Sequence, residues 1–79
     1  MRATTKFIPG RLYADVKDLS NATILRFVNY ERDLEGTCFE YVSGDSGYRK
    51  NDDGLIGFSA YSYKYALNKT ESKQYEPKP

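Results

Sequence analysis

The strongest constraint on the fold is the spacing of the apolar residues, which repeats every two positions and so predicts strands rather than helices. In residues 11–16, Leu12, Ala14 and Val16 alternate with Arg11, Tyr13 and Asp15. Pro9-Gly10 precedes this stretch and is a strong turn signal, because proline fixes φ and glycine accepts a positive φ. Residues 3–8 and 11–16 are therefore predicted to form a first hairpin.

The clearest strand covers residues 23–31, which are rich in β-branched and aromatic residues and contain neither glycine nor proline. Both of its faces are partly apolar, so it is predicted to lie centrally in a sheet. One face carries Ile24, Val28 and Tyr30, and the other carries Leu25 and Phe27. Residues 32–36 are predicted to close this strand with a turn.

Two further strands complete the pattern. In residues 37–43, Phe39 and Tyr41 lie opposite Cys38, Glu40 and Val42. Asp53-Gly54 is a hairpin signal, and residues 55–67 follow it as one long predicted strand. Its apolar side changes near residues 59–61, from Ile56, Phe58 and Ala60 to Tyr61, Tyr63, Tyr65 and Leu67, which is typical of a bulge or a barrel corner.

These elements predict a mostly β fold, a small five-stranded antiparallel barrel or curled sheet of the SH3-like or OB-like kind, with at most one short helix. Residues 1–67 form the single predicted domain. Residues 68–79 contain one aromatic and no aliphatic residue, and are predicted to be a flexible, disordered polar tail. The alternative fold is a β-sheet with one short helix around residues 17–22, where Asp18, Ser20 and Asn21 could cap a turn.

Composition leaves this fold without covalent or metal support. The 79 residues suffice for one domain and include one cysteine, Cys38, and no histidine. An internal disulfide and a Cys/His zinc site are therefore excluded, and stability must come from an efficient core or from self-association. A lone thiol, with no predicted signal peptide or membrane span, favours a cytoplasmic protein, in the host cytoplasm if the protein is viral.

The charges nearly cancel, with 12 Lys and Arg against 11 Asp and Glu. Such a balance gives no overall electrostatic footprint for nucleic acid, although a local basic patch remains possible after folding. Binding to an anionic membrane surface is equally unsupported. The charge balance therefore favours a protein partner over a nucleic acid or a membrane.

Catalytic residues are not evident, and the sequence predicts a protein that is not an enzyme. Histidine, the usual acid–base group at neutral pH, is absent. The carboxylate pairs lie in or beside turns, where aspartate is common for local hydrogen bonding; they are Asp15/Asp18, Glu31/Asp33 and Asp52/Asp53. Cys38 has no histidine to deprotonate it and is expected to be a buried structural thiol.

Metal and RNA signatures are incomplete. Four oxygen donors, Asp45, Asn51, Asp52 and Asp53, precede Gly54, but the calcium-loop pattern needs an acidic residue later in the strand, and none follows. Residues 56–63 match an RNA-recognition signature only at Gly57, Phe58 and Tyr63, and the helices of that domain are missing. No metal and no cofactor are predicted.

Tyrosine is the most heavily used aromatic residue, with eight in the chain. Five of them fall between residues 41 and 65, close to Arg49, Lys50 and Lys64. Tyrosine offers a large contact area at low conformational cost. Tyr61, Tyr63 and Tyr65 share one side of the predicted last strand, so they are expected to be buried together in the core or exposed together for a partner, burial being favoured. Tyr48, on a polar loop, is the best single candidate for a contact.

The predicted function is a small protein-binding module, of the kind of inhibitor or accessory protein that phages encode, acting by surface occlusion. Its predicted contact residues are Tyr48, Arg49, Lys50, Tyr61, Tyr63, Lys64 and Tyr65. One alternative is a small barrel that binds single-stranded nucleic acid by base stacking. Another is a virion or assembly component whose last strand pairs with a neighbouring subunit, which includes a homo-oligomer.

Overall fold

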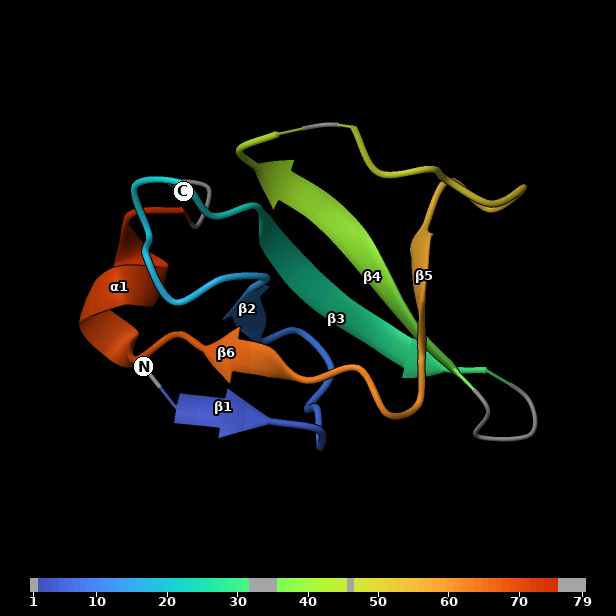
Figure 1. The fold of residues 1–79 in the computed structure, drawn as a ribbon, viewed down its shortest axis with the longest axis horizontal. Coiled ribbons are helices and arrows are strands. Elements are labelled where there is room, and N and C mark those ends of the chain that lie inside the picture. Colours follow the sequence, from blue (N-terminus) through green and yellow to red (C-terminus); the bar gives the residue numbers. More distant parts are fainter. Residues whose placement is uncertain (1, 32–35, 46, 76–79) are drawn as a thin grey trace.

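One antiparallel sheet and one short helix make up the described part of the chain, residues 2–31, 36–45 and 47–75 of a computed structural model (Figure 1). Within these residues the elements are β1 (Arg2–Thr4), β2 (Leu12–Ala14), β3 (Ile24–Tyr30), β4 (Gly36–Ser43), β5 (Ile56–Ser59), β6 (Lys64–Ala66) and α1 (Lys69–Lys73). The predicted mostly β fold with one short helix is confirmed.

The order of strands across the sheet is β1-β6-β2-β3-β4-β5. The predicted central position of the third strand is confirmed, since β3 pairs with both β2 and β4. In Figure 1, β3 and β4 run side by side and β5 crosses the start of β4 steeply. Among the described residues no backbone pairing joins the edge strands β1 and β5, so the sheet is open and a closed barrel is not confirmed.

The predicted first hairpin is wrong, although its turn exists. Gly10 has a φ of +88°, and the Arg11 amide donates to the Ile8 carbonyl at 3.1 Å. The flanking strands do not pair with each other: β1 pairs with β6, and β2 pairs with β3 and β6. Side chains replace the ladder here, because the Phe7 amide donates to the Tyr30 hydroxyl at 3.0 Å and the Ile8 amide to the Tyr13 hydroxyl at 2.9 Å.

The predicted long strand 55–67 is two strands, which raises the number in the described sheet from five to six. The Ser62 amide donates to the Ser59 carbonyl at 3.1 Å, and the chain turns there. β5 then pairs with β4, whereas β6 pairs with β1 and β2. The change of apolar face near residues 59–61 therefore marks a link between separate strands and not a bulge within one strand.

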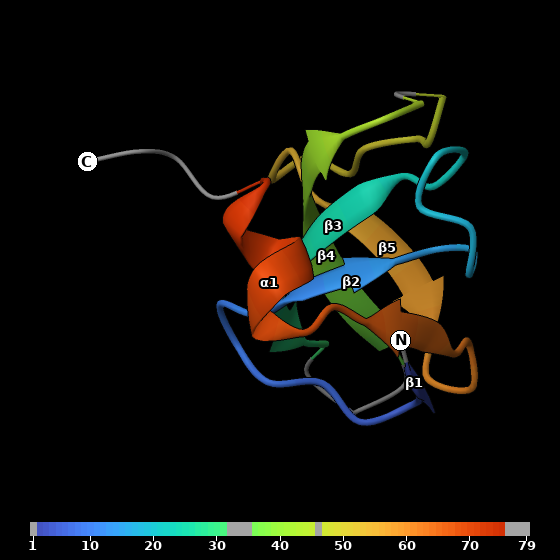
Figure 2. The ribbon, with the colours of Figure 1, turned by 90° about the vertical axis from the view of Figure 1, so that its left-hand side faces the viewer.

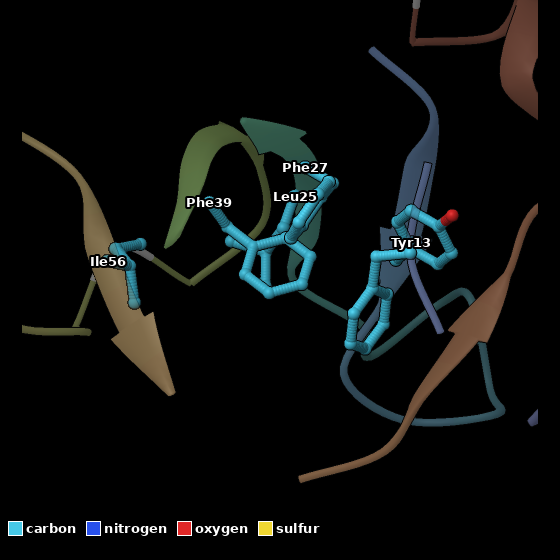
Figure 3. Close-up of a cluster of buried hydrophobic side chains, with 6 residues drawn as sticks. Tyr13, Leu25, Phe27, Phe39 and Ile56 are labelled. Carbon is cyan, nitrogen blue, oxygen red and sulfur yellow. The ribbon is translucent and has the colours of Figure 1, made fainter. Parts of the chain in front are cut away.

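The larger hydrophobic cluster gathers aromatic and aliphatic side chains from four strands and from the segment before β2 (Figure 3). Its buried members are Phe7, Tyr13, Leu25, Phe27, Phe39 and Ile56. Phe7 packs among them, with its ring centroid 4.9 Å from that of Tyr13 and 5.1 Å from that of Phe39, both in edge-to-face geometry. The need to bury Phe7 explains why residues 5–9 leave the strand path.

A second cluster forms from the residues that alternate with the first set along the strands. Its buried members are Leu12, Ala14, Ala22, Ile24 and Leu67, with Leu19, Val42, Tyr65 and Tyr75 packed against them. All three residues of β2 are buried, because its two faces contact different clusters. This chain therefore buries apolar surface on both faces of its central strands, which supports a small fold without a disulfide.

A bulge in β3 overturns one predicted face. The pairing of β3 with β4 shifts register between Phe27 and Asn29, and an extra residue there moves the following side chain to the opposite face. Tyr30 therefore lies beside Phe27, with ring centroids 4.9 Å apart, and not with Ile24 as predicted. The turn predicted at residues 32–36 lies outside the described residues except for Gly36.

The hairpin signal at Asp53-Gly54 is confirmed. Gly54 has a φ of +77°, and its amide donates to the Asn51 carbonyl at 3.0 Å. The Asn51 amide donates to the Leu55 carbonyl at 2.8 Å, and Lys50 bridges to Ile56. These hydrogen bonds hold the segments before and after the turn in register, as the local sequence signal predicts.

The single described helix is at residues 69–73, where a polar tail was predicted, and not at residues 17–22. Asn68 caps it: its side chain accepts from the Glu71 amide at 2.8 Å, while the Glu71 carboxylate accepts from the Asn68 amide at 3.0 Å. Tyr75 then packs against the second cluster. The helix at residues 69–73 was therefore not predicted, and residues 76–79 lie outside the described part of the chain. Around residues 17–22, Asp18 instead closes a turn by accepting from Ser20 and Asn21.

Candidate functional site

The seven predicted contact residues separate into inward and outward groups. Lys64 is only 3% exposed and Tyr48 is half-buried, whereas Arg49 and Lys50 are exposed. Tyr61 is 91% exposed and Tyr63 is 56% exposed. The exposed tyrosines therefore lie on the link between β5 and β6, and the prediction that they are buried as part of a strand face is wrong.

Tyr48 anchors its loop to the rest of the fold. Its hydroxyl donates to the Asp15 carboxylate at 2.6 Å, and its ring centroid lies 5.4 Å from that of Phe58. The other Asp15 oxygen accepts from the Thr23 amide at 2.7 Å. Burial raises the pKa of Tyr48 to about 12, and the hydrogen bond to Asp15 adds to this effect. These contacts leave Tyr48 less free for a partner than the sequence suggested.

Lys64 points into the larger cluster and not toward solvent. Its ammonium nitrogen lies 3.6 Å from the centroid of the Phe58 ring and 5.7 Å from that of Phe39. The Ser62 hydroxyl accepts a hydrogen bond from it at 2.8 Å. Burial lowers the pKa of Lys64 to about 8, because a low-polarity environment disfavours the charged form. Its predicted role as an exposed contact is therefore wrong.

Tyr61 and Tyr63 form the most exposed aromatic feature of the described residues, and we call these two residues the tyrosine link. Tyr63 contacts Tyr65 edge-to-face, with ring centroids 5.8 Å apart. The hydrogen bond between Tyr65 and Tyr63 raises the pKa of Tyr65. Tyr65 itself is half-buried against the second cluster. The link is thus tied to the sheet through Tyr65 while Tyr61 stands in solvent.

Arg49 and Lys50 lie on the loop between β4 and β5, whereas the tyrosine link lies between β5 and β6. Both side chains are exposed, and the Lys50 ammonium lies 5.9 Å from the centroid of the Tyr41 ring. Among the described residues, no cation–π contact joins these cations to Tyr61 or Tyr63. The single contact surface predicted from the sequence is therefore not brought together as one cluster.

Two of the polar residues in the predicted turns, Asn51 and Asp18, accept hydrogen bonds from nearby residues. The Asn51 side chain accepts from the Asp53 and Leu55 amides, at 2.9 and 3.0 Å. The hydrogen bond from Ser20 holds the pKa of Asp18 below its ordinary value. Among residues 2–31, 36–45 and 47–75, no group of three or more Cys, Asp or Glu side chains is placed to hold a metal ion. Asp33 lies outside these residues.

Cys38 is buried in β4. Burial raises the pKa of its thiol, and the charges of Glu31 and Asp53 act in the same direction. A raised pKa keeps the sulfur in its unreactive thiol form at neutral pH. The geometry therefore agrees with a structural role for this residue.

Sequence reasoning missed a basic hollow of about 490 Å³ between the start of β2 and α1. Arg11, Lys69 and Lys73 contribute its charges, and Leu12 and Leu67 contribute apolar surface. The lysines at positions 69 and 73 have helical spacing, which would have placed them on one face had the capping signal Asn68-x-x-Glu71 been used. The hollow is a second candidate site, separate from the tyrosine link.

No helix in the described ranges has the length and apolar character needed to cross a membrane. Comparison of the chain with models of known protein families, with curated proteins and with solved structures finds no match. Function must therefore be argued from the residues themselves.

Proposed function

We propose that this protein is a small, non-enzymatic protein-binding module whose contact surface is centred on the tyrosine link. The observation that carries the proposal is the 91% exposure of Tyr61 together with the 56% exposure of Tyr63. Tyrosine side chains are among the residues that contribute most to binding when they become buried in an interface. Two of them close together in the chain offer a partner a large apolar area with two hydrogen-bonding hydroxyls.

The link is well placed to bind without a large entropic cost. The segment that carries Tyr61 and Tyr63 joins β5 to β6 directly. The Ser62 amide donates to the Ser59 carbonyl and so closes a turn in this segment. Lys64 follows directly and is buried, with its ammonium bonded back to the Ser62 hydroxyl. Such anchoring limits the freedom that the link would lose on binding, and lower loss of freedom increases affinity.

Surface occlusion is the mode of action that we infer for this module. A 79-residue domain without evident catalytic residues would act on a partner by covering part of its surface. Tyr48 and Lys64 are not part of this contact, because both are engaged inside the fold. Arg49 and Lys50 are exposed and remain candidate contact residues at the edge of the proposed surface. Small accessory or inhibitory proteins of phages are the kind of protein that we propose on the basis of size and composition.

The test is quantitative binding to a captured partner. The native protein is used to capture partners from a lysate of its source, and the affinity for each is then measured with purified components. Replacing Tyr61 and Tyr63 together by alanine should weaken binding at least about tenfold, since interface tyrosines commonly contribute more than about 1 kcal/mol each. Both side chains are largely exposed, so the fold should persist even though the variant loses the contact between Tyr63 and Tyr65.

The matched control replaces Ile8 and Val16 together by alanine. These are also large and exposed, at 54% and 42%, but they lie on other segments. The control should bind the partner as the native protein does. Equal affinity of the tyrosine variant and the native protein for every captured partner would exclude the tyrosine link as the contact.

A further inference from the structure

The basic hollow lies between two segments that are far apart in the sequence. Figures 1 and 2 show α1 at one end of the molecule, beside β2 and β6. Arg11 immediately precedes β2, and Lys69 and Lys73 belong to α1. No acidic side chain of the described residues lines the hollow. Three positive charges thus meet in a chain whose formal net charge is only +1.

The wall that carries Arg11 is fixed by the sheet. The Gly10 amide donates to the Phe27 carbonyl at 2.9 Å, and the Phe27 amide donates to the Arg11 carbonyl at 3.0 Å. The Leu67 amide donates to the Leu12 carbonyl at 3.2 Å. Leu12 and Leu67 underlie the hollow and are each only 2% exposed. The site is therefore largely preformed, as is usual for small-molecule sites.

The helical wall presents two like charges to the hollow, those of Lys69 and Lys73. Lys69, Ser72 and Lys73 have the spacing of neighbours on one helix face, and two lysines at this spacing repel each other. Glu71 is two residues from each lysine, and residues at this spacing do not face each other on a helix; its carboxylate accepts from the Asn68 amide at the N-cap. An anion in the hollow would remove this repulsion.

Arg26 does not line the hollow itself but places a fourth positive charge next to Gly10, which does. Its guanidinium donates to the Gly10 carbonyl at 3.1 Å, which leaves further donors of its planar fork unused by that bond. Arginine binds phosphate through paired hydrogen bonds, and lysine binds it as a point charge. The arrangement of two arginines and two lysines matches a phosphate group better than a single carboxylate, since a phosphate monoester carries nearly two negative charges at neutral pH.

We propose that this hollow binds a small phosphate-bearing ligand through its basic side chains. Its volume, about 490 Å³, lies within the range of ligand sites. The proposal is independent of the proposed protein-binding function, because Tyr61 and Tyr63 do not line the hollow. Either idea can fail without the other.

The test is a titration of the isotope-labelled protein with AMP and, separately, with adenosine, followed by amide chemical shifts. AMP should give saturable shifts at residues 10–12, 67 and 69–73, and adenosine should give none there. The variant with Lys69→Gln and Lys73→Gln should bind AMP at least about tenfold more weakly, since it loses two charge-assisted contacts. Because glutamine is a good helix former and the substitutions remove a repulsion, the variant should unfold at the same or a slightly higher temperature.

The control changes two exposed lysines outside the hollow, Lys6→Gln and Lys17→Gln, which alter the net charge equally. It should bind AMP nearly as the native protein does. Equal weakening by both double variants would mean diffuse attraction and overturn the proposal, as would the absence of saturable AMP binding. Binding of an oligothymidylate of about twelve nucleotides through the same residues, about a hundredfold tighter than AMP, would overturn it in favour of a single-strand nucleic-acid surface.

Discussion

The ammonium nitrogen of Lys64 in β6 lies 3.6 Å from the centroid of the Phe58 ring in β5, although the two strands are not neighbours in the sheet. β6 pairs with β1 and β2, and β5 pairs with β4. The contact therefore joins two distant parts of an open sheet through side chains. It also places a lysine that is 3% exposed against aromatic rings, whose negative faces attract a cation.

The burial of Lys64 predicts a rise in stability at alkaline pH. Its pKa is lowered from 10.5 to about 8 in the folded protein, chiefly by burial. Below this range the amine is charged in both states; between the two values it is neutral when folded and charged when unfolded. The unfolded state then binds more protons, so the free energy of unfolding rises with pH. The stabilisation is absent below about pH 8 and complete near pH 10.5.

The measurement compares the native protein with Lys64→Met by urea unfolding from pH 6 to pH 11. Taking the difference in free energy of unfolding cancels the groups that titrate in both proteins. The native protein should gain stability relative to the variant across the alkaline window. Lys17→Met, at an exposed position, is the matched control. It keeps Lys64, so the difference in free energy of unfolding between it and the native protein should not change with pH. A flat difference for Lys64→Met would contradict the buried ammonium.

Tyr48→Phe should destabilise the protein by about 1–2 kcal/mol, since it removes one partly buried hydrogen bond to a carboxylate. The lost bond is the one from the Tyr48 hydroxyl to Asp15, at 2.6 Å. The Asp15 carboxylate would keep its bond from the Thr23 amide. Chemical denaturation of the variant gives the loss, and Tyr61→Phe, at a 91% exposed position, is the control expected to show none.

The raised pKa of Tyr48 also predicts that the protein loses stability at alkaline pH. The pKa of Tyr48 is raised from 10.0 to about 12, mainly by burial and then by Asp15. Between these values the folded protein keeps a proton that the unfolded chain has released, so stability falls as pH rises. Tyr48→Phe should lack this fall. If native protein and variant lose stability in parallel above about pH 10, the hydroxyl does not have the environment described.

The sequence predicted the elements whose signals are local. The alternation in β3 and β4 located both strands, and Asp53-Gly54 located their neighbouring hairpin turn. A strand at residues 3 and 4 was predicted but its partner was not, because Ala3 pairs with Tyr65 near the other end of the chain and nothing near Ala3 indicates this partner. The apparent hairpin at Pro9-Gly10 failed for a related reason: burying Phe7 in the core outweighs continued strand pairing.

The candidate site was predicted only where exposure follows from the local pattern. Arg49 and Lys50 are exposed, as their polar loop suggests. Lys64 was placed outside because lysine is rarely buried, and only the folded sheet brings the Phe39 and Phe58 rings around it. Tyr61 was expected to be buried because no local signal showed that the long strand divides. The helix, in contrast, could have been predicted from Asn68-x-x-Glu71.

Gly44→Ala should be strongly destabilising, by about 3 kcal/mol or more, since it adds a left-handed backbone penalty to a steric clash. Gly44 has a φ of +98°, and a Cβ there would lie 2.9 Å from the Thr23 Cα and closer still to the Ala22 carbonyl oxygen. Both obstacles are backbone and cannot rotate away. The position where β4 ends therefore requires glycine.

Gly54→Ala separates the two contributions to that loss. Gly54 has a φ of +77°, but a Cβ at this position would meet only open space. This variant should therefore lose only the backbone term, about 1–2 kcal/mol. Thermal or urea unfolding of both variants gives the comparison. Equal losses of stability for Gly44→Ala and Gly54→Ala would mean that the clash with the backbone of residues 22 and 23 does not contribute to the requirement for glycine at position 44.

Asn68→Ala should destabilise the protein by about 1 kcal/mol, the usual loss for a helix N-cap. A five-residue helix forms few bonds of its own, so its order depends on the cap and on the packing of Leu67 and Tyr75 at its two ends. The Glu71 amide, which donates to the Asn68 side chain at 2.8 Å, should exchange with solvent faster in the variant. Asn68→Asp keeps a capping oxygen and should keep most of the protection. If both substitutions speed the exchange of the Glu71 amide equally, the cap is not what holds α1 in place.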